Sequence, residues 1–260
     1  MATSTVEQSA SSQAKAAPLV RQILMQTRFE LLLTLRRGEN VLITLIVPVL
    51  LLIFFTSLNI VPAVGGRAVN FLLPGILALA VMAAGMVNLG IATAYERYYG
   101  VLKRLGGSPL PRSGLIIAKI MSILVLEVLQ VLILVGVAVV LYGWQPAGSP
   151  LLALLAMALG TVTFAALGLA MAGALRAEIT LAGANALFLL FVLLGGGILP
   201  LSHLPAPLAT IAQFLPAAAL TQALQVTMTN GGGFPGFALL VLAIWAVGIL
   251  LVAIRTFRWE

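Results

Sequence analysis

Residues 113–141 read SGLIIAKIMSILVLEVLQVLILVGVAVVL, and the apolar length of this stretch decides the class of fold. A membrane-spanning helix needs about 20 apolar residues to cross roughly 30 Å of hydrocarbon, and this stretch exceeds that length. The whole chain shares its character: 62% of the 260 residues are hydrophobic, 8% are charged, and the mean hydropathy is +1.16. This composition is typical of an integral membrane protein and leaves no room for a separate soluble catalytic domain.

Working outward, five further apolar runs have spanning length. They are residues 41–60, 71–94, 151–175, 179–199 and 237–254. With 113–141 they predict six transmembrane helices and an all-α, polytopic membrane protein. Residues 1–17 are rich in Ser, Ala and Gln and predict a disordered cytoplasmic tail. Residues 18–38 alternate apolar and basic residues at helical spacing, which predicts an amphipathic helix at the membrane surface and leaves 39–260 for the transmembrane domain.

The segment between the last two predicted spans, residues 200–235, is apolar but broken by prolines and a triple glycine. Apolar residues at spacings of four, three and four predict a short amphipathic helix there, namely Leu204, Leu208, Ile211 and Leu215. We expect Pro216 to end this helix and residues 217–229 to form a second one. Neither is long enough to cross, so the sequence predicts an extracytoplasmic re-entrant helical pair before the last span.

The basic residues are distributed unevenly among the predicted loops. If the chain crosses six times, 13 of the 14 Lys and Arg residues face one compartment and only Arg67 faces the other. Loops rich in Lys and Arg stay in the cytoplasm, so both termini and the loop that precedes residue 113 are expected there. The net charge of +7 is explained by this topology, and no nucleic-acid partner is expected.

Several function classes are excluded by what the sequence lacks. Cysteine is absent, which excludes disulfides, thiolate metal sites and cysteine nucleophiles. No GxxxxGK[ST] motif occurs, so the chain has no P-loop with which to bind ATP. The single histidine, His203, and seven carboxylates, all Glu, offer little for hydrolytic chemistry. No catalytic, cofactor-binding or metal-binding residue is predicted, and the chain is not expected to be an enzyme.

The loop at residues 95–112, YERYYGVLKRLGGSPLPR, is an island of charge between the second and third predicted spans. Val101, Leu102 and Leu105 are the apolar points of a short helix whose other face carries Lys103 and Arg104, and a double glycine ends it. An ordinary cytoplasmic loop that only sets topology is the alternative. Such a loop would need neither an ordered amphipathic helix nor a double-glycine stop.

This island resembles the cytoplasmic coupling loop of membrane-spanning permease subunits of type-2 ABC exporters, a family of drug, lipid and polysaccharide exporters. With Lys119 in the next span, the residues that carry the resemblance are Glu96, Arg97, Gly100, Leu102, Lys103, Arg104, Leu105 and Pro109. Residues 195–205 (GGGILPLSHLP), Leu215–Pro216 and Gln225 are also similar to the region before the last span in that family. Ala219 departs from the pattern, because the family often has a bulky polar or aromatic residue there.

The resemblance implies a role for the island. It would be a coupling helix that docks on a separate ABC ATPase subunit. Leu102 and Leu105 would fill a groove of that subunit, and Lys103 and Arg104 would pair with acids at the rim. A dimer of ATPase subunits would bind ATP and Mg²⁺, so no cofactor is expected in this chain. A second permease copy or a paralogue would complete a multi-pass complex in the bacterial plasma (inner) membrane.

Polar, flexible and aromatic residues inside the predicted spans are candidates for a substrate path. They are Met82, Met86, Asn88, Glu127, Asn185, Phe188 and Phe191. Glu127 fits a proton or cation-substrate site, and it also fits a structural hydrogen bond with Gln130. The asparagines fit bonds between helices, and the methionines and phenylalanines fit either an adaptable path or packing. Small residues at 85–89, 160–164 and 168–172 predict close helix contacts.

Weak polarity and few aromatic residues in the spans favour a hydrophobic or amphipathic substrate, drug-like or lipid-like, as in multidrug efflux. A permease for lipid-linked polysaccharide is one alternative, and it would be expected to offer aromatic faces and hydrogen-bonding groups. A proton-driven secondary transporter is another, which needs paired intramembrane ionisable groups and commonly has repeated halves. Only Glu127 qualifies as such a group, and the two halves of the sequence do not match.

Overall fold

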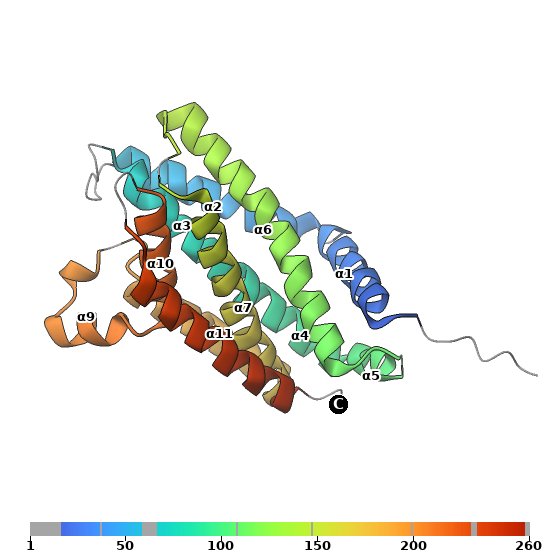
Figure 1. The fold of residues 1–260 in the computed structure, drawn as a ribbon. Coiled ribbons are helices and arrows are strands. Elements are labelled where there is room, and N and C mark those ends of the chain that lie inside the picture. Colours follow the sequence, from blue (N-terminus) through green and yellow to red (C-terminus); the bar gives the residue numbers. More distant parts are fainter. Residues whose placement is uncertain are drawn as a thin grey trace, which may run out of the picture.

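The computed structural model describes residues 17–36, 38–58, 67–107, 109–146, 148–198, 200–229 and 233–257, with backbone alone at 39–41 and 43. The predicted tail lies outside these residues except for Ala17, as do Lys15, Arg37 and Arg258. Every regular element in the described part is helical (Figure 1). The elements are α1 (Leu19–Arg36), α2 (Gly38–Leu58), α3 (Val69–Met82), the π-helical η1 (Ala83–Asn88), α4 (Leu89–Tyr98), α5 (Val101–Gly106), α6 (Arg112–Tyr142), α7 (Pro150–Ala174), α8 (Ala177–Leu194), the 3-10 turn η2 (Leu201–His203), α9 (Ala206–Ala212), α10 (Pro216–Thr227) and α11 (Gly236–Thr256).

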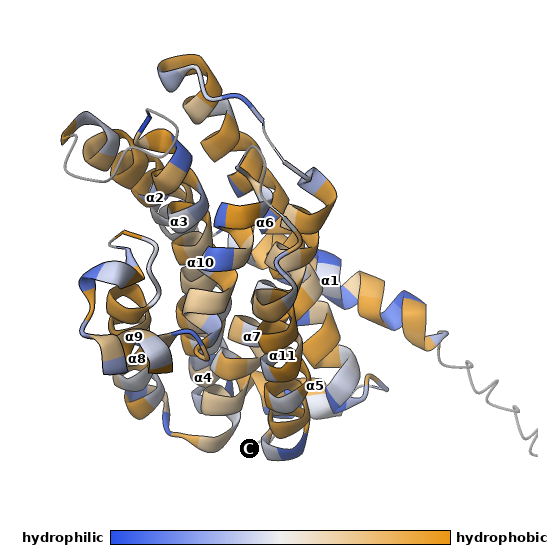
Figure 2. Cartoon of the chain, turned by 60° about the vertical axis from the view of Figure 1, so that its left-hand side comes forward, coloured by the Kyte–Doolittle hydropathy of each residue, from blue (hydrophilic) through white to orange (hydrophobic). Residues whose placement is uncertain are grey.

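Five helices in the described part are long and apolar enough to cross a membrane. They are α6, α7, α8, α11 and the continuous helix Val69–Tyr98, which joins α3, η1 and α4. Helix α2 is a sixth apolar helix with a shorter apolar part, Thr44–Leu58. Most of the long helices consist of hydrophobic residues, whereas α1 alternates between hydrophilic and hydrophobic bands (Figure 2). The predicted all-α, polytopic membrane fold is confirmed.

Hydrogen bonds gather several helix termini at one end of the bundle. The guanidinium of Arg97, near the end of α4, donates to the carbonyls of Gly173 (2.5 Å) and Leu175 at the end of α7. Arg112, which begins α6, donates through Nη1 to the carbonyl of Phe257 after α11 (3.3 Å). Figure 1 shows α5 and the C-terminal end of the described chain at this end. We call it the α5 end.

The opposite helix termini meet at the other end of the bundle. Arg67, just before α3, donates through Nη1 to the carbonyl of Gly143 after α6 (2.6 Å). The backbone N–H of Ser149, before α7, donates to the carbonyl of Thr227 at the end of α10 (2.9 Å). The helices therefore alternate in direction along the chain, as the predicted topology requires, and Arg67 lies away from Arg97 and Arg112.

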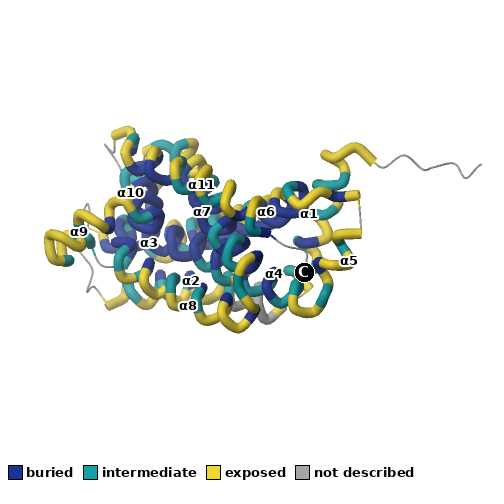
Figure 3. The backbone as a smooth tube through the Cα atoms, turned by 90° about the horizontal axis from the view of Figure 1, so that it is seen from below, coloured by how far each residue is buried: buried dark blue, intermediate teal, exposed yellow. Residues whose placement is uncertain are grey.

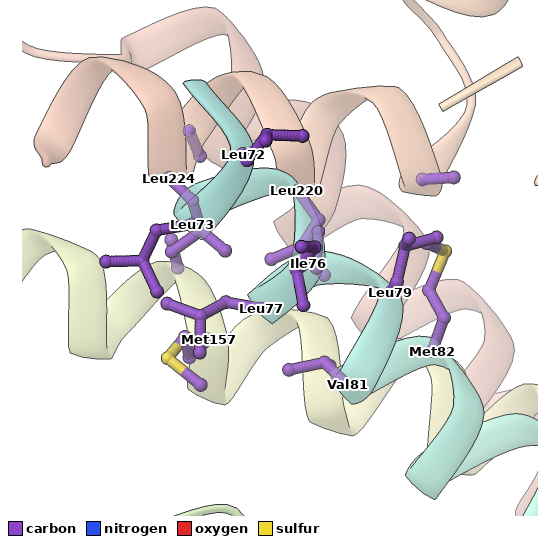
Figure 4. Close-up of a cluster of buried hydrophobic side chains, with 14 of the residues drawn as sticks. Leu72, Leu73, Ile76, Leu77, Leu79, Val81, Met82, Met157, Leu220 and Leu224 are labelled. Atoms are coloured by element: carbon purple, nitrogen blue, oxygen red, sulfur yellow. The ribbon is translucent and has the colours of Figure 1, made fainter. Parts of the chain in front are cut away.

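Helix α3 is the centre of the bundle and is buried along almost its whole length (Figure 3). It packs against α2, α6, α7 and α10. In Figure 4, Leu73 and Leu77 of α3 lie near Met157 of α7, and Leu220 of α10 lies near Ile76. A helix that is apolar on every side is stable only where protein or lipid surrounds it. Here the chain itself surrounds α3.

Glycines allow the backbones of neighbouring helices to touch. A Cβ added to Gly90 of α4 would lie 2.8 Å from the Cα of Gly168 in α7, and one added to Gly85 would lie 2.8 Å from the backbone N of Ala165. This confirms the predicted close contacts of residues 85–89 and 168–172. At Gly75 in α3 an added Cβ would lie 1.9 Å from the carbonyl oxygen of Gly197, so the segment after α8 also reaches α3 at backbone distance.

Helices α9 and α10 form a broken pair with a bend of 82°. Pro216 begins α10, whereas the sequence predicted only that it would end the preceding helix. Proline lacks an N–H and has a fixed φ, and both properties suit the first turn of a helix. Trp245, inside α11, donates through Nε1 to the carbonyl of Phe214 (2.8 Å), while Thr227 lies at the Ser149 end. Helix α10 thus starts part-way along α11 and returns to the bundle end, consistent with the predicted re-entrant pair.

Site-directed labelling can test which ends of the helices share a compartment. Single cysteines replace exposed residues of this cysteine-free chain at Lys103 and Glu178, near the α5 end, and at Gln145 and Phe234, near the other end. A membrane-impermeant maleimide should label the first two only from the cytoplasm and the last two only from outside. Gly148 is unsuitable because a Cβ there would lie 2.2 Å from the carbonyl oxygen of Thr227. Labelling of all four sites from one side would contradict the alternating topology.

Candidate functional site

The short helix α5 projects from the α5 end as a separate turn of the chain. Gly100, with φ 71°, separates it from α4 in the left-handed region that residues with a Cβ rarely adopt. The predicted coupling segment spanned residues 95–112, but its helix covers Val101–Gly106 alone. Glu96 and Arg97 belong to α4, the continuation of a membrane-spanning helix, and Pro109 lies exposed in the following loop.

Leu102 does not lie where the sequence interpretation placed it. Its side chain is 1% exposed and belongs to a core cluster with Leu89, Leu115 and Phe257. Leu105 is half-buried and packs against the same cluster. The expectation that Leu102 fills a groove of a partner is therefore wrong, because this side chain already fills a space between α4, α6 and α11 of its own chain. The leucines fix α5 to the spans.

The outward face of α5 and the adjoining turn carries a different set of side chains. Tyr98, Tyr99, Val101, Lys103 and Arg104 are all exposed. The rings of Tyr98 and Tyr99 meet edge to face with centroids 5.1 Å apart, and Tyr95 stacks on Tyr99 at 6.1 Å. An aromatic and apolar centre beside two cations is the composition that protein interfaces favour. We call these five residues the α5 surface.

A buried ion-pair cluster near the α5 end joins α1, α4 and α6. Lys119 of α6 is 0% exposed, and its Nζ lies 3.0 Å from Oε2 of Glu30 in α1 and 2.7 Å from Oε2 of Glu96 in α4. Gln26 donates through Nε2 to the other oxygen of Glu30 (2.9 Å). We call Lys119, Glu30 and Glu96 the Lys119 cluster. Removing one member of a buried ion pair leaves an uncompensated charge, which costs about 3–5 kcal/mol.

The sequence interpretation missed this cluster, because it counted Lys119 among the charges that set topology. The sequence nevertheless contained two features that indicated such a cluster. Glu30 is the one acidic residue in the predicted surface helix at 18–38, and Lys119 stands several residues inside an apolar run. An unpaired charge at either position is energetically unfavourable, so each residue indicated that an oppositely charged partner lies nearby.

A crevice of about 340 Å³ opens between α2, α3 and α8. Its walls are mainly apolar, and the residues that line it include Val47, Pro48, Leu51, Ile76, Leu79, Ala80, Ala83, Phe188, Leu189, Val192 and Ile198. We call it the α2–α3–α8 crevice. Concave, mainly apolar pockets with a few polar groups are the usual form of small-molecule sites.

The polar groups of this crevice form one hydrogen-bonded set. Asn88 donates through Nδ2 to Oγ1 of Thr44 (3.1 Å), and Gln130 donates through Nε2 to the carbonyl of Thr44 (2.8 Å). Asn88 ends the π-helical segment η1, and π segments occur frequently at functional sites. The bond confirms that Asn88 joins helices. Gln130 pairs with α2, so its predicted pairing with Glu127 is wrong.

Asn88 also borders a wider hollow of about 520 Å³ that runs along α4 toward the α5 end. Tyr95, Glu96 and Tyr99 line it, with Val101 at its far limit. We call it the α4 hollow. It places an aromatic and acidic surface between the α5 end and the α2–α3–α8 crevice.

The seven candidate path residues are not gathered in one place. Asn88 and Phe188 line the α2–α3–α8 crevice. Met82, Met86 and Phe191 are buried in the core, where Phe191 meets Phe164 edge to face at 5.7 Å. Packing therefore explains these three side chains.

The remaining two candidates lie elsewhere. Asn185 is exposed and donates to the carbonyl of Leu181 in its own helix (2.8 Å), and the predicted bond to another helix is not found among the described residues. Glu127 is buried against α7 and accepts a hydrogen bond from the Thr161 hydroxyl. Glu127 therefore makes a structural hydrogen bond between helices, as one of the two predictions held. Its partner is Thr161 and not Gln130.

A comparison with protein families finds a match for this chain. The model described as ABC-2 type transporter matches residues 21–229. This range covers most of the chain and includes α5, the Lys119 cluster, the α2–α3–α8 crevice and α10. A comparison with curated proteins gave no match.

The Lys119 cluster gives a testable stability prediction. Lys119→Met should lower the thermal unfolding midpoint of the detergent-solubilised protein, because Glu30 and Glu96 would remain buried as unpaired carboxylates, at a cost of about 3–5 kcal/mol. Adding Glu30→Gln and Glu96→Gln should restore much of that loss by removing both charges. Arg104→Met, at an exposed site, is the matched control and should leave the midpoint unchanged. A single Lys119→Met variant as stable as the parent would show that the cluster contributes little.

Proposed function

The chain belongs to the ABC-2 type transporter family and is the membrane-spanning permease component of an ABC transporter, and from this premise we propose a specific function. It is an exporter subunit that moves a hydrophobic or amphipathic molecule, drug-like or lipid-like, out of the cytoplasm or the inner leaflet. A separate ATPase subunit powers it. The observation that carries the proposal is that α5 packs through Leu102 on α4, which is continuous with the α3 and η1 residues that line an apolar crevice.

The α5 surface supports the docking part of the proposal. A partner that contacts Tyr98, Tyr99 and Val101 would find an apolar centre, with Lys103 and Arg104 to pair with its acidic residues. Leu102 packs α5 against the core beside α4, and the Lys119 cluster ties α4 to α1 and α6, so a push on α5 would displace these helices together. Rigid-body motion of this kind is a common way to switch a protein between two states. The ATPase dimer would supply the ATP and Mg²⁺ that drive it.

The crevice supports the substrate part of the proposal. Its aliphatic walls suit an apolar body, and the Thr44–Asn88–Gln130 set offers a few hydrogen-bonding groups. The α4 hollow reaches it from the α5 end, which is the cytoplasmic end in the proposed topology. A second permease copy or a paralogue would face the exposed apolar residues of α2 and α8, which include Leu50, Phe54, Leu189 and Leu193.

The alternatives have less support. A polysaccharide carrier would be expected to present several aromatic faces, and Phe188 is the one aromatic side chain among the described residues of the crevice. A proton-driven carrier needs ionisable groups on the substrate path, and Glu127 is not among the residues that line the crevice. Neither alternative accounts for α5.

Docking can be tested by charging the α5 surface. Tyr98→Asp with Val101→Asp should abolish co-purification with the ATPase subunit while leaving the permease inserted and folded, because both side chains are exposed. Reversing the charges of Lys103 and Arg104 should weaken association less, and the effect should fade at high salt. Leu102→Asp should instead reduce the yield of folded permease, since it buries a carboxylate.

The control for this experiment is Gln145→Asp, which is also an exposed site and lies at the opposite end of the bundle. It should leave co-purification and transport unchanged. Full ATPase association and transport by the Tyr98→Asp, Val101→Asp variant would refute the docking assignment.

The crevice can be tested by filling it. Ala83→Trp places a large side chain in the α2–α3–α8 crevice and should reduce export of amphipathic compounds, measured as resistance of the host cell, by about tenfold or more, while ATPase association persists. Val140→Trp adds the same bulk at a side chain that is 80% exposed and should have no effect. Normal export by a folded Ala83→Trp variant would exclude the crevice as the path.

A further inference from the structure

Glu127 lies at the centre of α6 and outside the crevice assigned to the substrate. The helix runs 31 residues from Arg112 to Tyr142, and Glu127 is eight residues beyond Lys119, or about 12 Å along the axis. This position is deep in the membrane-spanning part of the chain. Burying an ionisable side chain at such depth costs free energy, so these residues usually pair with another group or have a functional role.

Among the described residues, only one of the two carboxyl oxygens of Glu127 has a hydrogen-bond partner. One oxygen, Oε2, accepts the hydroxyl hydrogen of Thr161 from α7. The other, Oε1, is buried and accepts no hydrogen bond from any residue that the structure describes. The side chain as a whole is 3% exposed, so bulk water does not replace the missing donor. An unpaired buried acceptor needs an explanation, which the contact with Thr161 alone does not supply.

Glu127 also lines a crevice of about 280 Å³ between α6 and α7. Apart from Glu127 the walls are apolar, with Val128, Leu132 and Leu154 among them. These three side chains are exposed on the outer face of the bundle, where a bilayer would meet them. We call this space the α6–α7 crevice. Because these rim residues are exposed, a molecule could enter the crevice from the lipid. The α6–α7 crevice shares no lining residue with the α2–α3–α8 crevice, so the two are separate.

The residues that line this crevice indicate which class of molecule would bind there. An apolar tail matches the walls, and a hydrogen-bond donor matches the unpaired oxygen. An amine matches best, because a neutral lipophilic amine enters hydrocarbon readily and can then take the proton of a neutral carboxyl. That transfer gives an ammonium paired with a carboxylate, so the charges form together and compensate each other. A hydroxyl head would exchange hydrogen bonds with the neutral carboxyl but is too weak a base to take its proton, so it would form no ion pair.

We propose that the α6–α7 crevice is a second binding site, in which the carboxyl of Glu127 holds the amine head of a lipophilic amine that enters from the bilayer. The head lies beside Glu127 and Thr161. The tail follows Val128 and Leu132 toward the lipid. The site is separate from the proposed substrate path and does not depend on docking of the ATPase.

Carbodiimide labelling of the full chain in phosphatidylcholine vesicles tests the proposal without any transport. Dicyclohexylcarbodiimide dissolves in lipid and adds a protonated carboxyl across its C=N bond, and the adduct rearranges to a stable N-acylurea that mass spectrometry can locate. Glu127 should be labelled, and Glu127→Gln should not. Dodecylamine, used as its N,N-dimethyl derivative so that it cannot form an amide with the activated carboxyl, should slow the labelling about tenfold when present at about ten times its dissociation constant. Dodecanol at the same membrane concentration should protect much less.

Two variants keep the result interpretable. Val128→Trp places bulk at the lipid-facing rim, where the side chain is exposed, and should remove protection by dodecylamine. Val140→Trp on the same helix lies outside the crevice and should behave as the parent does.

Two kinds of result would overturn the proposal. A folded protein that is not labelled at Glu127, or is labelled equally fast with and without dodecylamine, would show that this carboxyl is only a structural partner of Thr161. Equal protection by dodecanol would show a site for neutral donors. Either result leaves the proposed export function untouched, because no ATPase or transported cargo takes part.

Discussion

One ammonium group between two carboxylates holds the α5 end of this protein together. Lys119 brings α6 to α1 through Glu30 and to α4 through Glu96. Helix α1 lies along the outside of the bundle, and α6 is the element it contacts most. The pairing of buried charges therefore sets where α1 lies against the bundle and which face of α4 meets α6. Apolar packing alone is non-directional and would tolerate other arrangements, whereas these charges are stable in only one.

The arrangement explains how a helix of six residues can be rigid. A helix this short is not stable alone in water. Here Gly100 sets its direction, Leu102 fixes it to the core, and Arg97 ties the preceding turn to the end of α7. The side chains of this turn that do not take part in these contacts are exposed and form the α5 surface. The same turn therefore provides both the attachment to the spans and the contact surface.

Much of the fold could be predicted from the sequence, and the errors have a common physical origin. Apolar length located the spans, because it depends on composition over some 20 residues. Small residues at close spacing correctly indicated helix contacts such as Gly90 with Gly168. The partners of Lys119, Glu127 and Gln130 could not be predicted, because each lies on a helix distant in sequence. The error at Leu102 arose because a helix of fewer than two turns does not show from its periodicity which face is buried.

The π segment η1 gives the longest buried helix two different orientations. A π turn takes in more residues than an α turn, so the six residues Ala83–Asn88 rotate α4 by an angle on the order of 100° relative to an unbroken α-helix. Before this segment the helix packs through apolar side chains such as Leu73 and Leu77, and beyond it Glu96 faces Lys119. The segment η1 therefore sets which face of α4 points at α6 independently of which face of α3 points at its neighbours. The first part of the helix packs through apolar side chains, and the second part forms an ion pair. Deleting one residue there would leave the hydropathy of the span almost unchanged and still separate the two charges.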